Sequence, residues 1–246
     1  MTGGQIKFEV NALAFCKVLQ AVALFQARPQ DFSEYARVHC YARHDGLLLS
    51  ASNGSSAAIA RVDVDELAGS GGFELPAGQV KALLAVFKRP VPKDFSSDEY
   101  VLEVSADEHL VRVKDISDLF DHDELVLAVQ ATDVDNPHMP APGEMAMSLA
   151  ATMMRTVQDA LPLDLTSGVY FSPDEVERIA KAAKILGREL YLRPQGRSLT
   201  TPISDDFYAS TVAQHSEHDR KPPFRDARAV HAWDERLHEL VNLGVM

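Results

Sequence analysis

Apolar and polar residues alternate in short runs along much of this chain, and stretches of helical periodicity separate the runs. Alternation is typical of strands with one buried face, whereas apolar residues three and four positions apart indicate amphipathic helices. The pattern predicts four helices, at 11–28, 76–89, 148–161 and 172–188. It predicts strands at 5–10, 35–43, 47–52, 57–64, 73–75, 100–104, 110–114, 125–129, 144–147, 169–171, 189–193, 198–203 and 207–212.

The clearest of these helices is 172–188. Ser172 can cap its start, Pro173 suits the first helical position, and Glu175 completes a capping box with Ser172. Gly187 stands where a left-handed residue commonly ends a helix. At helical spacing one side is apolar, with Val176, Ile179, Ala180, Ala183 and Leu186, and the opposite side is cationic, with Arg178, Lys181, Lys184 and Arg188. A solvated surface helix has the same pattern, so its function depends on what surrounds it.

The order of elements divides the chain into two parts. Residues 133–143, DVDNPHMPAPG, hold three prolines and one glycine and form the best candidate linker. We therefore predict a first domain at 1–132 and a second domain at 144–214. The second domain is shortened, because between its two predicted helices it has only the short strand 169–171. A polar tail follows at 215–246, with one amphipathic stretch in which Trp233, Leu237, Leu240 and Val241 share a helical face.

Composition is that of a soluble globular protein, with 246 residues, 46% hydrophobic and 24% charged. An apolar run of about 18 residues is missing, which excludes a membrane-spanning helix. The N-terminus has no charged and apolar signal-peptide pattern, and this predicts a cytoplasmic location. Cys16 and Cys40 are too few for a disulfide framework or a zinc quartet, and we expect both to be reduced core residues.

Charge is distributed unevenly over the predicted elements. The net charge of the chain is −12, which at first sight argues against a polyanionic partner. However, the four predicted helices hold ten of the 24 basic residues and four of the 36 acidic ones, a net charge of +6 that leaves −18 for the rest. This contrast favours helices that face a phosphate backbone, with an acidic exterior elsewhere. Aromatic residues do not interleave with the cations and no base-reading motif is present, so we expect contact with duplex DNA without sequence specificity.

An enzymatic role finds little support in the sequence. The GSGG turn at 69–72 lacks the Lys and Ser/Thr of a phosphate-binding loop. Candidate metal ligands occur only in small sets, namely His215, His218 and Asp219, Asp63 and Asp65, and Asp205 and Asp206. Solvated turns and tails explain these sets better than metal binding, because further ligands at suitable spacing are missing. His39 and His109 fall in strand patterns, which favours surface or hydrogen-bonded histidines over catalytic bases. We therefore predict no catalytic residue, no metal and no cofactor.

Four stretches of the chain form a recognisable order. They are IKFEVNALAFCKVLQAV, GLLLSASNGSSAAIARVDV, GGFELPAGQVKALLAVF and SGVYFSPDEVERIAKAAKILGRELYLRPQGRSLTTPISDDFYASTVAQ. The first three resemble the first domain of bacterial DNA sliding clamps, the beta subunits of DNA polymerase III, and the fourth is similar to the end of a clamp's last domain. The resemblance covers residues 5–214 in patches. It rests on order and spacing, because no single motif in it is strict.

The resemblance implies an α+β clamp fold of repeated domains, with helices lining an inner face and antiparallel sheets outside. It implies a processivity factor that encircles double-stranded DNA and serves a replicative DNA polymerase and a clamp loader, as a homo-oligomeric ring of two or three copies. The lining helices would supply the DNA-binding residues Lys17, Lys81, Lys88, Arg89, Arg155, Arg178, Lys181, Lys184 and Arg188. A groove for partner peptides would use the final strand, Tyr208 to Val212.

The chain also departs from this family. Bacterial clamps have three domains per chain, whereas this chain has room for about two. The alternative is therefore a clamp-like protein that does not encircle DNA and acts as a decoy or regulator of replication or transcription partners. Oligomeric state separates the two hypotheses, since a ring must be a closed oligomer.

Overall fold

A computed structural model describes most of the predicted first domain and the last part of the second. The described residues are 5–28, 35–44, 46–117, 119–120, 122–128, 171–195 and 198–212. They all belong to one unit, Met1–Ala213. The linker 133–143, the predicted elements at 144–161 and the tail 215–246 lie outside the described residues, so the predicted domain boundaries stay a prediction.

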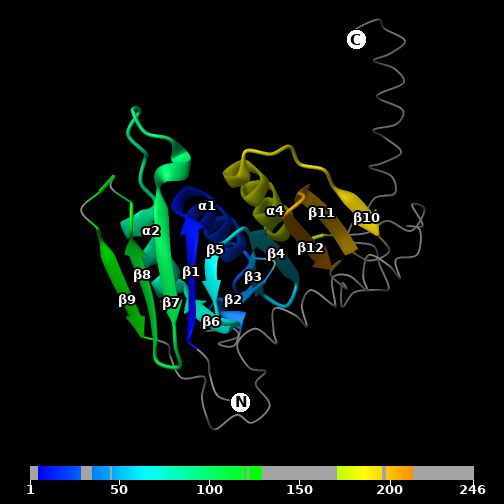
Figure 1. The fold of residues 1–246 in the computed structure, drawn as a ribbon. Coiled ribbons are helices and arrows are strands. Elements are labelled where there is room, and N and C mark those ends of the chain that lie inside the picture. Colours follow the sequence, from blue (N-terminus) through cyan, green and yellow to red (C-terminus); the bar gives the residue numbers. More distant parts are fainter. Residues whose placement is uncertain are drawn as a thin grey trace, which may run out of the picture. The chain divides into compact units, whose positions relative to one another are not determined.

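Two antiparallel sheets form the framework (Figure 1). The five-stranded sheet has the order β5-β1-β7-β8-β9, and the seven-stranded sheet has the order β10-β11-β12-β4-β3-β2-β6. The first sheet contains β1 (Ile6–Asn11), β5 (Asp65–Ala68), β7 (Val101–Ala106), β8 (Leu110–Asp115) and β9 (Glu124–Ala128). The second contains β2 (Arg37–Arg43), β3 (Gly46–Ser52), β4 (Ser56–Val62), β6 (Gly71–Pro76), β10 (Arg193–Gln195), β11 (Ser198–Ser204) and β12 (Phe207–Val212).

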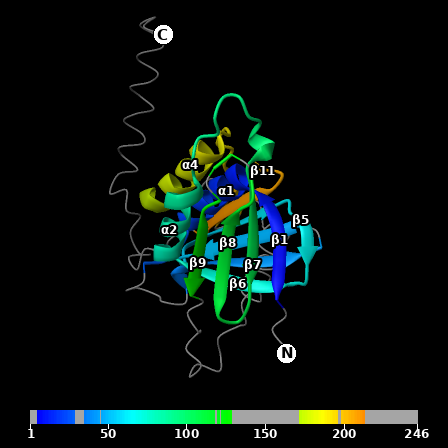
Figure 2. The ribbon, with the colours of Figure 1, turned by 60° about the vertical axis from the view of Figure 1, so that its left-hand side comes forward.

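Three α-helices of the described residues lie against these sheets (Figure 2), and a 3-10 turn, η2 (Ser97–Glu99), precedes β7. They are α1 (Ala12–Ala23), α2 (Ala77–Phe87) and α4 (Pro173–Leu186), close to three of the predicted helices. The Asn11 side chain accepts a hydrogen bond from the Ala14 N–H and so caps α1, as an asparagine before a helix commonly does. That helix ends at Ala23, before the predicted end at 28. Gly187 ends α4 in the left-handed region at φ 67°, as predicted.

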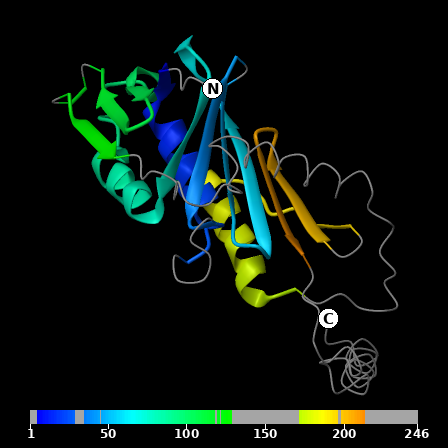
Figure 3. The same ribbon diagram turned by 90° about the horizontal axis from the view of Figure 1, so that it is seen from below.

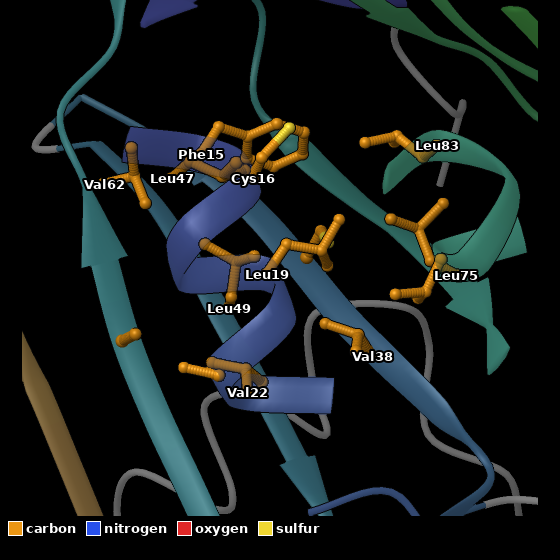
Figure 4. Packing of buried hydrophobic residues seen from close by; sticks show 14 of the residues in the cluster. Phe15, Cys16, Leu19, Val22, Val38, Leu47, Leu49, Val62, Leu75 and Leu83 are labelled. Carbon is orange, nitrogen blue, oxygen red and sulfur yellow. The ribbon is translucent and has the colours of Figure 1, made fainter. Parts of the chain in front are cut away.

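The main core lies between α1 and the seven-stranded sheet (Figure 4). Phe15, Leu19 and Val22 of α1 point toward apolar side chains of β2, β3 and β4 and toward Leu75 and Leu83. Cys16 is part of this core, and Cys40 of β2 is buried as well. Both cysteines are free and buried, as predicted.

The last three strands of the described chain extend the sheet that β2, β3, β4 and β6 form (Figure 3). β12, which comes last in the described sequence, pairs antiparallel with β4, placing Tyr208 opposite Ile59 and Ser210 opposite Ala57. On the helical side, α4 contacts α1. Residues of the predicted second domain therefore extend the sheet and the helical layer of the first.

Three strand and helix predictions need correction. The stretch 189–193 is not a strand along its length, because only Arg193 joins β10 and Leu190, Tyr191 and Leu192 stay exposed. Conversely, the sequence pattern missed β5, which pairs with β1. On α4, Ile179 and Ala183 are buried as predicted, but Val176 and Ala180 are only half-buried. Ala182 packs inward with them.

Candidate nucleic-acid interface

Helix α1 lies between α2 and α4 and contacts both, so the three helices form one layer (Figure 2). Each helix packs one side inward and exposes the other. The exposed positions of this layer include Lys17 on α1, Lys81 on α2 and Lys184 on α4. Neither α1 nor α2 contains an acidic residue. The outward side of this layer is therefore cationic over its first two helices.

Five of the nine predicted DNA-binding residues lack an ion-pair partner among the described residues. We call them the free cations: Lys17, Lys81, Lys88, Lys184 and Arg188. All five are exposed, and among the described residues none has an acidic side chain at ion-pair distance. Lys88 instead donates a hydrogen bond to the neutral Gln20 Oε1 at 2.6 Å. These side chains can exchange water and counterions for phosphate oxygens without breaking an internal ion pair.

The free cations of different helices approach one another around the middle of α1. A Cβ atom placed on Gly187 would lie 3.9 Å from Lys17 Nζ, so the end of α4 reaches this lysine. One turn along α1, Gln20 accepts from Lys88 at the end of α2. The carboxyl ends of α2 and α4 therefore both approach α1 near Lys17. Cations also suit these ends, because the helix dipole is negative there.

Three other predicted residues form internal contacts. Arg89 Nη2 lies 2.6 Å from Asp123 Oδ2, and its guanidinium stands over the Phe120 ring at 5.5 Å. Lys181 Nζ lies 2.8 Å from Glu177 Oε1, an exposed pair one helical turn apart. Arg178, the third, is half-buried.

Arg178 is used to hold α4 against α1. Its Nη1 donates to the Leu24 carbonyl oxygen at 2.6 Å, and its Nε lies 3.4 Å from Glu175 Oε2. A guanidinium engaged in this way is a poor candidate for DNA contact. The ninth predicted residue, Arg155, lies outside the described residues.

Sequence reasoning also missed the role of Glu175. The predicted capping box does not form, because the Ser172 side chain makes no cap hydrogen bond. Glu175 is instead 8% exposed and accepts hydrogen bonds from Asn53 Nδ2 and Ser56 Oγ in the turn between β3 and β4. The sequence holds no signal for this contact, because its partners are about 120 positions away.

The predicted partner groove coincides in part with a surface hollow. This hollow has a volume of about 390 Å³ and lies over β3, β4 and β12, with Leu48, Ile59 and Tyr208 among its lining residues. Arg61 lines it as well and forms an ion pair of 3.0 Å with Asp206. Val212, at the far end of β12, is 51% exposed but does not line the hollow. The hollow therefore joins apolar side chains to a charged border.

The rival metal sites do not assemble in the described part of the chain. There, no group of three or more His, Cys, Asp or Glu side chains is placed to hold a metal ion. Arg61 Nη2 lies 3.0 Å from Asp206 Oδ1 and 3.6 Å from Asp63 Oδ1, so these carboxylates share a cation of the protein itself. His215, His218 and Asp219 fall outside the described residues. Of the described helices, none has the length and apolar character needed to cross a membrane.

Comparison with solved structures shows that the fold is that of bacterial sliding clamps. The beta subunit of DNA polymerase III from Thermotoga maritima aligns at a TM-score of 0.55 and 14% identity, covering 89% of this chain and 68% of that chain. The Pseudomonas aeruginosa DnaN sliding clamp, bound to griselimycin, aligns at a TM-score of 0.53 and 15% identity and covers the same shares of the two chains. The Bacillus subtilis clamp aligns at a TM-score of 0.53 and 10% identity.

These likenesses confirm the predicted α+β clamp fold. They are similarities of fold at low identity. No protein-family description matches the chain, and no curated protein does.

Proposed function

We propose that this chain is a sliding clamp that encircles duplex DNA without sequence specificity and tethers replication proteins, with no chemistry of its own. The observation that carries the proposal is the helical layer of a clamp fold with five free cations on a protein of net charge −12. Repulsion between this acidic protein and DNA is overcome only where the cations gather. Binding is therefore confined to one face.

The chemistry of these residues supports contact with the phosphate backbone rather than with bases. Lysine ammonium groups on flexible stems recognise phosphate as point charges and carry no base-reading geometry. Each phosphate contact releases counterions, so the affinity falls steeply with salt. Such contacts are weak and exchange rapidly, which suits a protein that slides.

Assembly into a ring of two or three copies requires strand edges that can pair between copies. Among the described strands, β9 is one of the two edge strands of the five-stranded sheet, and its Val126 is 47% exposed. An edge strand with unpaired backbone groups is a template for another strand. β9 is the third strand after α2, and β12 is the third strand after α4. Within the chain, β12 pairs with β4. We propose that β9 pairs in this way with a second copy, in a head-to-tail contact that closes into a ring.

Partner proteins would bind at the hollow that Tyr208 lines. The Helicobacter pylori clamp, of TM-score 0.50 with this chain, was solved with a DNA ligase peptide, so a protein of this fold binds a peptide. In this chain the apolar Leu48 and Ile59 beside the Arg61–Asp206 pair offer a place for a short apolar segment with a polar end. A replicative polymerase and a clamp loader are the partners that we propose for it.

Retention on circular DNA tests encirclement directly. We expect the assembled protein to stay on a nicked circular plasmid through gel filtration and to be lost once the plasmid is linearised, because only a closed ring needs an end to escape. A companion mass measurement should give a dimer or a trimer. Loading by the cognate loader, or assembly of subunits around the circle, supplies the starting complex.

Two outcomes would reject the sliding-clamp proposal. Equal retention on circular and linear DNA would show binding without encirclement. A monomer that binds no DNA, yet captures a polymerase, would favour the decoy or regulator. A variant with Lys17→Gln, Lys184→Gln and Arg188→Gln serves as the control, since it should bind a short linear duplex more weakly while keeping its fold and, as a closed ring, its retention on the circle.

A further inference from the structure

The turn between β3 and β4 is held by residues from the start and from the end of the stretch 171–212. Asn53 Nδ2 donates to Glu175 Oε1 at 3.0 Å, and Ser56 Oγ donates to Glu175 Oε2. On the other side of the turn, the Ser55 carbonyl accepts from the Val212 N–H at 2.9 Å and from Thr211 Oγ1 at 3.1 Å. The turn therefore joins the start of α4 and the end of β12 to the first part of the chain.

Glu175 is fixed more firmly than a surface carboxylate. It is 8% exposed, and its two oxygens accept from a side-chain amide and a hydroxyl. Asn53 is itself held, because its Oδ1 accepts from the Ser55 and Ser56 N–H groups at 2.9 and 2.7 Å. A buried carboxylate whose donors are themselves ordered makes a contact of defined geometry, since loss of either donor leaves a desolvated charge.

We propose that Glu175 is a positioning residue for the DNA-binding face, although it does not contact DNA. It fixes the first turn of α4 against the β3–β4 turn, and Arg178 fixes the second turn to the Leu24 carbonyl. α4 is a rod of 14 residues, about 21 Å long. Because Glu175 and Arg178 lie about one turn apart, their contacts together fix the position and the direction of this rod, and so the place of its other end. That other end carries Lys184 and Arg188 and reaches Lys17.

This inference depends on the proposed DNA binding only for its functional consequence. The arrangement itself predicts that loss of the Glu175 contacts leaves the fold in place but lets the end of α4 move relative to α1. The free cations of α4 then no longer act together with Lys17. We therefore expect a loss of DNA affinity from a substitution on the side of α4 that faces away from DNA.

The test measures this movement with spin labels. Labels go at Ala14→Cys on α1 and Glu189→Cys just after α4, two exposed positions that leave all free cations intact. The native Cys16 and Cys40 are buried, so the labels react selectively. We expect a broader distribution of the distance between the two labels in Glu175→Ala than in the parent. We expect the same in Asn53→Asp, because this change places a second carboxylate opposite Glu175. Glu175→Gln keeps an acceptor for Asn53 and should restore the narrow distribution. Asp174→Ala is the matched control, because Asp174 is an exposed acidic residue of the same helical turn without an ion pair among the described residues.

DNA binding is measured on the same variants without labels. For Glu175→Ala binding to a short duplex, we expect the slope of log K against log salt to decrease in magnitude by about 2 relative to the parent. This is the change that the loss of two phosphate contacts would cause. Folded Glu175→Ala protein with a parental distance distribution would overturn the positioning role. If the parent itself binds no DNA, the proposed function fails, while the distance measurement still decides whether Glu175 positions α4.

Discussion

Neutralising three of the free cations should remove a measurable number of phosphate contacts. The variant replaces Lys17, Lys184 and Arg188 by glutamine, which keeps most of the side-chain length and removes the charge. These three residues come from α1 and from the end of α4, and none pairs with an acidic side chain in the described structure. Each lost contact lowers the slope of log K against log salt by about 0.9, so three contacts lower it by about 2.7.

The assay is fluorescence anisotropy with a short labelled duplex, titrated from about 50 to about 200 mM salt, the range over which phosphate contacts change affinity most visibly. Over this fourfold range, each contact accounts for about a 3.5-fold change in affinity. Thermal unfolding should show little loss of stability, because exposed substitutions usually stay within about 0.5 kcal/mol. The substitution of Lys17 can lower the stability by up to about 1 kcal/mol more, because this lysine lies near the negative end of the α4 helix dipole.

A control with the same change in net charge decides whether the face or only the total charge matters. Lys7, Arg112 and Lys114 lie on the outer side of the five-stranded sheet. Lys7 pairs with Glu103 at 2.8 Å, Arg112 pairs with Glu124 at 2.6 Å, and Lys114 stands opposite these two glutamates. Replacing these three by glutamine should leave the salt slope unchanged. An equal drop in both triple variants, or no drop in the first, would refute the assignment of DNA binding to the helical face.

Further predictions concern the fold itself. Phe15→Ala should lower the free energy of unfolding by about 3–5 kcal/mol in a denaturant titration, because the ring is fully buried in the core. Asn11→Ala should cost about 1 kcal/mol in the same titration through loss of the α1 cap. Burial would raise the pKa of Glu74, but the neighbouring His39 and Arg37 side chains outweigh it and lower that pKa. The ionised Glu74 carboxylate therefore stabilises the fold at pH values above its unfolded-state pKa, and this stabilisation is lost as the pH falls through its folded-state pKa. Glu74→Gln should lower the free energy of unfolding at neutral pH, and the difference from the parent should shrink as the pH falls. Burial raises the pKa of Cys16 to about 12, so a thiol reagent should label it only on unfolding.

Periodicity and end signals predicted the helices because each has a local cause. Asn11 caps α1, Pro76 precedes α2, and Gly187 ends α4 at positive φ, all as the sequence indicates. Strand prediction was weaker where pairing decides the outcome. The stretch 189–193 has strand-forming residues, but only Arg193 finds a partner strand. β5 was missed because its residues DELA are mostly exposed and lack an apolar pattern.

The candidate site could be predicted as a set of charges but not as a set of contacts. Counting residues on a helical wheel indicates which cations share a face. It does not indicate which of them meet a carboxylate from another element. Arg89 meets Asp123 from the segment before β9, and Arg178 meets the Leu24 carbonyl at the end of α1. Long-range pairing of this kind distinguishes Arg89 and Arg178 from the five free cations, whereas Lys181 pairs with Glu177 within one helix.

The position of the acidic residues explains how a protein of net charge −12 can offer a face to a polyanion. In the described structure, carboxylates pair with cations on the outer side of the five-stranded sheet and at the joint around Glu175. On α4 they occupy the first half of the helix, as Asp174, Glu175 and Glu177, whereas Lys184 and Arg188 lie at its end. α1 and α2 contain none. Because exposed charges are screened over about 8–10 Å at physiological salt, a nearby phosphate experiences the free cations more strongly than the distant acidic surface. Net charge therefore sets how DNA is repelled from afar, and the helical layer sets where it can bind.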